Sequence, residues 1–419
     1  MNNIADERVL NEVNRDRVVT LLQEMVRIKS YTDEELELAE FMADWLRKQG
    51  LEVNLQECTP TKYHKKSANV IAILKGTGGG QNLILNGHLD TDPACGDWTY
   101  DPWDPVIFDG NKLNGLGTTN MKTGDAAMVE AVLAIKDAGI RLKGDILLTL
   151  VCRELQGGWG THRVLEEYTA DFGIVTERTF FKIGFNPSMA IIHPQIQIYG
   201  KTAHVHEPQK AICATTKMGE VITALSRLDF PYTREAAPPE HGNYPVMAIG
   251  AARSGVGENF YDGRPATIGD RAVIKMDVRL DRNQTEEMVY KDIQDVLDRM
   301  SSEDPQLKTK LEPMPTYINR PFYELPMDSY IIHVINRAHQ RIIGEEVGRL
   351  PSTGGTDAAV LTEAGIPTAV YGYGGGSLKY PDMFVDVPDL YTNIDELPNL
   401  AKVLALSCLE TCNTPKKQA

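Results

Sequence analysis

Residues 84–124 constrain the fold more than any other part of the 419-residue sequence, because two buried segments end there in tight turns. The apolar run from Asn82 to Asn86 follows the glycine-rich turn 76–80 and is too short for a helix, so it predicts a buried strand. His88 and Asp90 follow this strand, and residues two apart on an extended chain share a face. The carboxylate of Asp90 can therefore orient the imidazole of His88 toward a metal or a substrate.

A second glycine turn, Gly115–Gly117, leads into a predicted helix and places Asn120 and Lys122 at its start. We expect the two turns to converge on one site. Elsewhere helical and strand patterns alternate: Asn11–Arg27 carries an apolar stripe of helical period, and Asp145–Val151 is an uninterrupted apolar run typical of a buried parallel strand. This alternation predicts an α/β fold with a mixed, mostly parallel sheet.

Thr32 and Glu35 have the spacing of a capping box, in which two side chains satisfy the free amides at a helix start. The pair predicts the beginning of a second helix, which ends at Gly50.

Composition narrows the class of protein. The net charge of −15, from 43 basic and 58 acidic residues, disfavours nucleic acids and anionic membranes as partners. The six cysteines form no CxxC pair, the first residues have no signal-peptide core, and no stretch of about twenty apolar residues occurs. We therefore predict a cytoplasmic protein with no nucleic-acid or membrane partner.

The stretch around the two turns resembles the co-catalytic zinc peptidase superfamily that includes aminoacylases, carboxypeptidase G, acetylornithine deacetylase and succinyl-diaminopimelate desuccinylase. The G-H-x-D pattern of that family is Gly87–Asp90 here, and its G-R-G-x-x-D-M-K-G pattern corresponds to Gly115–Gly124. The resemblance implies that His88 and Glu177 stand at zinc-ligand positions. It also implies that Glu154, in the counterpart of the family's D-E-E-x-G-G run, is the general base.

Three positions depart from the family's ligand set. Asn120 stands where the family has the aspartate that bridges two zinc ions, Leu155 where it has a glutamate ligand, and Asp386 where it has a histidine ligand. A neutral amide cannot replace a carboxylate shared between two dications. We therefore expect no tightly bound zinc pair and no cofactor. The alternative is a single zinc or other divalent ion on His88 and Glu177, with Asn120 or Asp386.

From about Ser188 the pattern changes to the order β-α-β-β-α-β, which suits a ferredoxin-like insert. Strands are expected at Ala190–Tyr199, Pro245–Ala251 and Arg271–Leu280, and helices at Lys210–Leu228 and Gln284–Met300. The resemblance implies a discontinuous catalytic domain, 1–188 with 314–419, and a lid and dimerisation domain at 189–313 that forms a homodimer.

The resemblance also implies residues that contact the substrate. In relatives the histidine at the position of His204 polarises the substrate carbonyl, and the residues matching Asn259 and Arg279 meet its carboxylate. Gly355 and Thr356 resemble a substrate loop that opens a helix, where backbone amides favour a carboxylate. Arg178 adds a permanent cation beside Glu177, or else is a solvated loop residue.

The preferred hypothesis is an enzyme that acts on the C–N bond or the adjacent carbon of a small amino-acid-derived substrate through acid/base catalysis by Glu154, without dinuclear zinc. The catalytic set would be Glu154, His204, His88 and Asp90, and Asn120 and Arg178 would help to bind the substrate. Elimination, epimerisation, cyclisation and amide exchange stay open as reactions. The alternatives are a hydrolase with one metal ion and a catalytically inactive binding or regulatory protein.

Overall fold

The computed structural model describes residues 4–185, 190–236, 244–351, 354–383 and 387–416. The chain divides into two compact units, one formed by Met1–Asn186 with Tyr323–Ala419 and the other by Pro187–Phe322. Each has its own apolar core. Among the described residues no helix is both long and apolar enough to cross a membrane.

The second unit extends further along the chain than the sequence pattern predicted. Residues 314–322 were expected in the catalytic domain, but Ile191 and Arg320 exchange backbone hydrogen bonds of 3.1 and 2.9 Å, and Met314 N donates to His193 O at 2.8 Å. These bonds tie the segment to the first strands of the second unit. Such bonds cannot be predicted from the pattern of neighbouring residues, because they join residues more than a hundred positions apart.

The first unit is built on an eight-stranded sheet among the described residues. Its strands, in spatial order, are β1 (Glu52–Glu57), β2 (Ala68–Leu74), β6 (Ile146–Val151), β3 (Leu83–His88), β7 (Phe172–Val175), β15 (Thr368–Tyr371), β8 (Ile183–Phe185) and β14 (Arg349–Pro351). The central pairs β6–β3, β3–β7 and β7–β15 are parallel, whereas β1–β2, β2–β6 and β15–β8 are antiparallel. The predicted mixed, mostly parallel α/β fold is confirmed.

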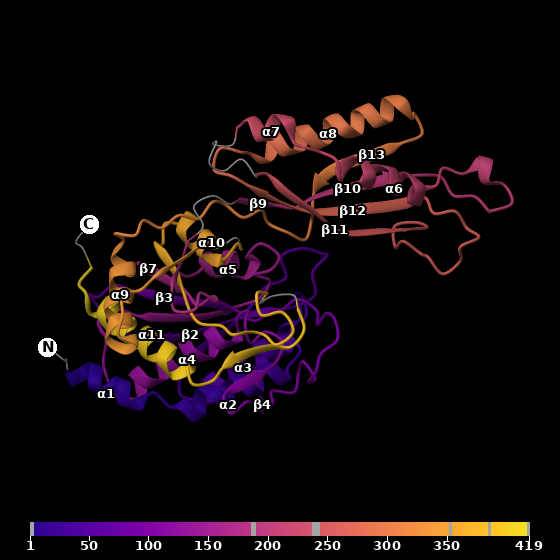
Figure 1. The fold of residues 1–419 in the computed structure, drawn as a ribbon. Coiled ribbons are helices and arrows are strands. Elements are labelled where there is room, and N and C mark those ends of the chain that lie inside the picture. Colours follow the sequence, from indigo (N-terminus) through magenta and orange to yellow (C-terminus); the bar gives the residue numbers. More distant parts are fainter. Residues whose placement is uncertain (1–3, 186–189, 237–243, 352–353, 384–386, 417–419) are drawn as a thin grey trace. The chain divides into compact units, whose positions relative to one another are not determined.

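Helices cover both faces of this sheet (Figure 1). The helices of this unit are α1 (Ile4–Glu12), α2 (Arg15–Arg27), α3 (Leu36–Lys48), α4 (Lys122–Asp137), α5 (Trp159–Leu165), α9 (Tyr330–Ile343), α10 (Asp357–Glu363) and α11 (Leu397–Asn413). Of these, α1 and α2 pack on α4 and α11. The helix α4 is buried from Lys122 to Ile135 because it packs between the sheet and α2 and α11. A small four-stranded sheet lies apart from the main one and has the order β16 (Gly376–Ser377), β17 (Leu390–Asn393), β5 (Lys112–Asn114) and β4 (Ile107–Phe108).

The predicted capping box at the start of α3 is wrong. Helix α3 begins at Leu36, and its N-cap residue Glu35 is itself helical and makes no side-chain cap. The hydroxyl of Thr32 donates to Asp90 instead, at 3.1 Å. The carboxylate of Glu35 accepts from the amide of Arg153. Thr32 and Glu35 thus bind groups that follow β3 and β6, and these groups compete with the first amides of α3.

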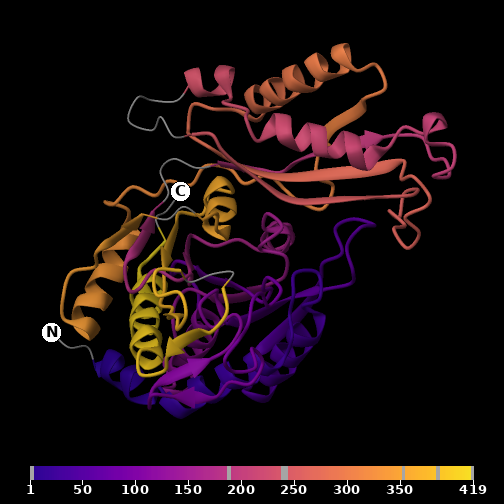
Figure 2. The same cartoon turned by 45° about the vertical axis from the view of Figure 1, so that its right-hand side comes forward.

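The second unit is an antiparallel sheet covered on one face by helices, as Figure 2 shows. The sheet order is β11 (Val246–Gly255), β12 (Arg271–Leu280), β10 (Pro194–Tyr199) and β13 (Lys308–Pro313), and β9 (Ala190–Ile192) also pairs with β12. Its helices are α6 (Ala214–Leu225), α7 (Pro231–Glu235), α8 (Glu286–Glu303) and the 3₁₀ turn η1 (Pro208–Lys210).

The single strand predicted over Ala190–Tyr199 is interrupted at His193, between β9 and β10. The amide of His193 donates to Asn319 Oδ1 at 3.2 Å rather than to a neighbouring strand, so the ladder breaks there.

Candidate active site

Three neighbouring parallel strands place polar side chains at one edge of the main sheet. His88 ends β3, Glu154 follows β6, and Glu177 follows β7. The carboxyl ends of parallel strands are where such sheets form their binding crevices. His88 and Glu154 are buried and Glu177 is partly buried, so the three side chains interact in a setting of low water content.

Both ring nitrogens of His88 face oxygen atoms. Nδ1 lies 2.8 Å from the backbone oxygen of Asp90 and 3.5 Å from its Oδ1. Nε2 lies 3.2 Å from Asn120 Oδ1, 3.7 Å from Glu177 Oε1 and 4.0 Å from Glu154 Oε2. Nε2 is therefore the nitrogen that faces the site, as the position of Asp90 two residues on predicted.

Asp90 has a second role that its spacing from His88 did not indicate. Its carboxylate accepts hydrogen bonds from the amides of Glu154 at 3.0 Å and Leu155 at 3.1 Å. Burial raises the pKa of Asp90, but its bond to His88 and these two amides outweigh burial and lower the pKa. Asp90 is thus a buried carboxylate that joins β3 to the turn after β6.

The charges around His88 favour its protonated form when no metal is bound. Burial lowers the pKa of His88, but the bond to Asp90 and the negative charges of Glu154 and Glu177 raise it well above its usual value. A cation is therefore stabilised at this position, whether it is a proton on Nε2 or a metal ion beside it.

The residues present fit one divalent ion. His88, Glu154 and Glu177 each offer a ligand atom, and these atoms lie within 4.8 Å of one another. One imidazole nitrogen and two carboxylates form a donor set of the kind that zinc accepts, and Asn120 Oδ1 lies beside them. The expectation that no cofactor binds is not supported by this arrangement, whereas the alternative of a single ion is compatible with it. Asp386, the other predicted ligand, lies outside the described residues.

The predicted substrate-binding residues of the first unit lie on three segments. Asn120 lines a small pocket with Thr91, Asp92, Cys95, Leu116 and Leu390, among others. The guanidinium of Arg178 stacks on Phe180 with its centre 4.6 Å from the ring, and burial lowers its pKa to about 10 against the opposing charge of Glu177. Gly355 precedes Thr356, which caps α10 by accepting from Ala358 N at 3.2 Å, so the prediction that this loop opens a helix is confirmed.

The predicted residues of the second unit do not form one cluster within it. His204 is exposed, stacks on His206 at 4.9 Å and bridges to Thr267, just before β12. Asn259 lies in the turn after β11, whose last residue pairs with the first residue of β12. Arg279 lies near the other end of β12 and binds Asp277 through Nε and Nη2 at 2.5 and 2.9 Å. Their roles toward a substrate stay predictions.

The sequence did not direct attention to Asp125, a fully buried acid in the first turn of α4. Neither of its carboxyl oxygens has a hydrogen-bond partner among the described residues, and a Cβ at Gly87 would lie only 2.0 Å from Oδ1. Burial raises the pKa of Asp125 well above its usual value. The positive charge of His88 opposes this shift, and the negative charge of Glu177 adds to it. The available signal was an acid directly followed by the apolar run Ala126–Val129.

The sequence is similar to those of known proteins. The model of the family described as Peptidase family M20/M25/M40 matches residues 84–410. The N-formyl-4-amino-5-aminomethyl-2-methylpyrimidine deformylase of Halalkalibacterium halodurans is 24% identical, over 96% of each chain. The acetylornithine deacetylase of Proteus mirabilis is 28% identical, over 84% of this chain and 85% of its own.

A solved structure of similar fold is that of the di-peptidase Dug1p from Saccharomyces cerevisiae. It has a TM-score of 0.78 and covers 98% of this chain and 99% of its own, at 13% identity. At that identity the likeness establishes the fold.

Proposed function

Because this chain belongs to peptidase family M20/M25/M40, we propose that it is an amidohydrolase that cleaves the C–N bond of a small N-acylated amine or amino-acid derivative with the help of one divalent metal ion. The observation that carries the proposal is the cluster of His88, Glu154 and Glu177 at the ends of three adjacent strands. The reactions named for the two sequence relatives, deformylation and deacetylation, favour hydrolysis over elimination, epimerisation, cyclisation or amide exchange.

His88 and Glu177 would hold the ion, with Asn120 Oδ1 as a third donor. Glu154, the remaining member of the cluster, would lie beside the ion as the base and not as a ligand. A bound divalent ion supplies Lewis-acid polarisation of the scissile carbonyl and lowers the pKa of water. Only one ion is proposed, because Leu155 offers no donor atom and Asn120 carries no charge to share between two dications.

Glu154 would act as the proton carrier of the reaction. Its carboxylate accepts a proton from the attacking water and delivers it to the nitrogen that leaves, which is the usual cycle of a general base that becomes a general acid. Asp90 binds both the amide of Glu154 and the ring of His88, so it fixes the positions of the base and the imidazole relative to each other. The apolar side chain of Leu155 next to Glu154 favours a site with little water.

Substrate contacts are proposed for the remaining predicted residues. Arg178 supplies a guanidinium that can bind a substrate carboxylate in a bidentate manner. Asn259 and Arg279 are proposed to bind the same kind of group, and His204 to polarise the carbonyl. The amides of Gly355 and Thr356 at the start of α10 offer a further anion contact.

We propose a homodimer formed by the second unit, in a cytoplasmic protein. Strand β11 is a ten-residue edge strand that pairs with β12 on one side and has no strand partner on its other side among the described residues. Small residues are exposed along it, and Val246 is 50% exposed. A long open edge of this kind is a template for pairing with a second chain.

The test is a metal-dependent cleavage assay. The purified chain, stripped of metal and then supplied with Zn²⁺, Mn²⁺ or Co²⁺, is incubated with N-formyl, N-acetyl and N-succinyl amino acids and with dipeptides in deuterated water. We expect cleavage of at least one class, one bound ion per chain, and a loss of about a hundredfold in turnover in Glu154→Gln.

Two readouts separate the roles within the site. If Glu154 is the base, the Glu154→Gln variant keeps the metal ion. If Glu154 is a ligand, the variant loses the metal ion. His88→Ala is the matched loss-of-metal control. Deuterium at a substrate carbon without cleavage would contradict hydrolysis and favour metal-independent proton transfer instead.

A further inference from the structure

The turn that carries Glu154 is held by three consecutive backbone hydrogen bonds to buried carboxyl groups. We refer to Arg153–Leu155 as the elbow. Arg153 N donates to Glu35 Oε1 at 3.1 Å, and the amides of Glu154 and Leu155 donate to the two oxygens of Asp90 at 3.0 and 3.1 Å. No amide of the elbow is left to water, so its position is set by two side chains from elsewhere in the chain.

The elbow needs this support because its backbone is strained. Arg153 has a φ of 55°, in the left-handed region that non-glycine residues rarely adopt. Such a conformation is unfavourable for a residue with a Cβ atom and persists where surrounding contacts impose it. It turns the chain sharply after β6, so that Glu154 faces His88.

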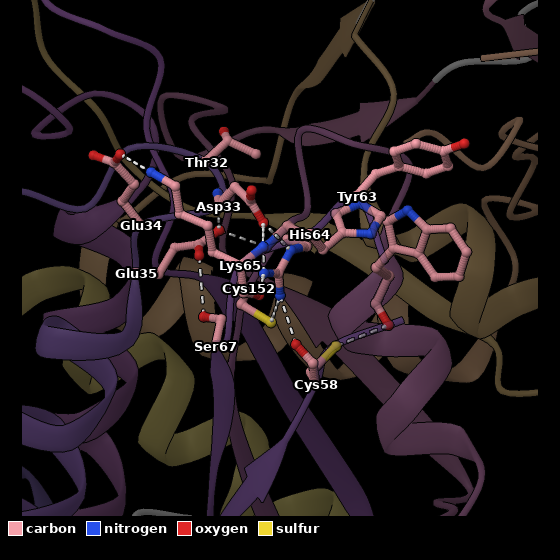
Figure 3. A network of polar contacts seen from close by, with 12 residues as sticks. Thr32, Asp33, Glu34, Glu35, Cys58, Tyr63, His64, Lys65, Ser67 and Cys152 are labelled. Atoms are coloured by element: carbon pink, nitrogen blue, oxygen red, sulfur yellow. Dashed lines mark hydrogen bonds and ion pairs between the residues drawn. The ribbon is translucent and has the colours of Figure 1, made fainter. Parts of the chain in front are cut away.

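The side chain of Arg153 is fixed as well. It is fully buried, and its guanidinium donates to Asp33 Oδ1 from Nε at 2.9 Å and from Nη2 at 2.6 Å. Nη1 donates to the backbone oxygen of Cys58 at 2.7 Å. Figure 3 shows Asp33, Glu35 and Ser67 gathered around Cys152, the residue before the elbow.

A single short segment, Thr32–Glu35, supplies most of these contacts. Thr32 Oγ1 donates to Asp90 Oδ2 at 3.1 Å, Asp33 binds the guanidinium of Arg153, and Glu35 binds its amide. Ser67 Oγ donates to the other oxygen of Glu35 at 3.0 Å. Thr32 and Glu35, which have the spacing of a helix capping box, thus contact Asp90 and the elbow, and α3 has no side-chain cap.

We propose that Thr32, Asp33 and Glu35 are positioning residues that hold Glu154 in its place opposite His88 and Glu177. This inference rests on the proposed function, which assigns proton transfer to Glu154. The three residues act through the elbow and through Asp90. Their importance follows from the short reach of proton transfer, since a displacement of about 1 Å costs about a hundredfold in rate.

The first test needs no substrate. Amide hydrogen exchange of the peptide that spans residues 150–157 is measured by mass spectrometry in the full-length protein, for wild type, Glu35→Ala and Glu35→Gln. We expect exchange at least tenfold faster in Glu35→Ala and nearly unchanged in Glu35→Gln, because glutamine keeps the accepting oxygen. Glu34→Gln is the matched control, since Glu34 pairs with Lys65 and makes no contact with the elbow among those described.

Unchanged exchange in Glu35→Ala would overturn the proposal. So would equal acceleration in the Glu34→Gln control. This result does not depend on activity, so a wild type that cleaves no N-acyl substrate removes the proposed function and leaves the exchange experiment to decide on the elbow.

The second test uses the N-acyl substrate that wild type cleaves best. Glu35→Ala should lower kcat about tenfold and change KM less than twofold, with Glu35→Gln restoring most of kcat. A loss that glutamine does not restore indicates a merely structural role and contradicts the proposal.

A third test uses a second pair of variants and covers the case in which Glu35→Ala does not fold. Thr32→Val keeps the size of Thr32 and removes only the hydroxyl that donates to Asp90, whereas Thr32→Ser keeps that donor. We expect kcat to fall several-fold in Thr32→Val and to recover in Thr32→Ser, with the same metal content in both. Wild-type kcat in Thr32→Val would exclude Thr32 from the positioning set.

Discussion

Glu35 should make the first unit less stable as the pH rises from acid to neutral. Its carboxyl group is fully buried, and burial together with the negative charge of Asp90 raises its pKa from an ordinary value of 4.5 to about 7, against the opposing effects of two backbone amides and Arg153. The folded chain therefore keeps the proton to higher pH than the unfolded chain. Stability that is present below about pH 4.5 is lost as the pH rises through about 7.

The size of the effect follows from the two pKa values. A difference of about 2.5 pKa units corresponds to about 3 kcal/mol, because one unit is worth about 1.4 kcal/mol. Most of this loss, on the order of 2 kcal/mol, falls between pH 5 and pH 8. Other groups titrate over the same range, so the quantity to measure is the difference between wild type and Glu35→Gln, whose side chain stays neutral.

The assay is urea unfolding of both proteins at pH 5, 6, 7 and 8, followed by tryptophan fluorescence. All four tryptophans lie in the first unit, at Trp45, Trp98, Trp103 and Trp159. The signal therefore reports unfolding of the unit that contains Glu35, and equal m-values would allow the free energies to be subtracted.

We expect wild type to lose stability relative to Glu35→Gln as the pH rises, and Glu34→Gln to run parallel to wild type. A flat difference would refute the reasoning. A difference of opposite sign would show instead that Glu35 is held as a charged partner of Arg153, with the attraction of the guanidinium outweighing burial.

Three further predictions concern metal, substrate and assembly. Glu177→Gln should bind less than a tenth of the metal of wild type by elemental analysis and lose hydrolysis with it, whereas unchanged metal content would remove Glu177 from the ligand set. Arg178→Ala should raise KM for a substrate with a free carboxylate about tenfold and leave KM for its methyl ester unchanged, and an equal effect on both would contradict carboxylate binding. The double variant Ala248→Lys/Ala252→Lys, which places charge along the edge strand β11, should be a monomer by light scattering where wild type is a dimer; a wild-type monomer would exclude the dimer altogether.

The order of elements was predictable because it depends on local rules, and the position of the site was predictable because the motifs around it resemble those of a known family. A short apolar run between turns predicts a buried strand, and β3 carries His88 at its end as the spacing indicated. Glu154 and Glu177 were located by the resemblance to the zinc peptidase superfamily. The sheet explains why they meet His88, since polar residues that follow buried parallel strands lie at one edge of the sheet. The same resemblance placed Asn120 and Leu155 at positions where the family has metal ligands.

Partners far apart in the chain were not predictable in this way. Thr32 and Glu35 have the spacing of a capping box in any context, and only the tertiary fold, in which α3 packs on β1 and β2, brings them to Asp90 and Arg153 instead. The burial of Asp125 against Gly87 and the inclusion of 314–322 in the second unit have the same origin. Periodicity and turn chemistry act over a few residues, whereas the choice between a local and a distant hydrogen-bond partner depends on which groups the folded chain removes from water.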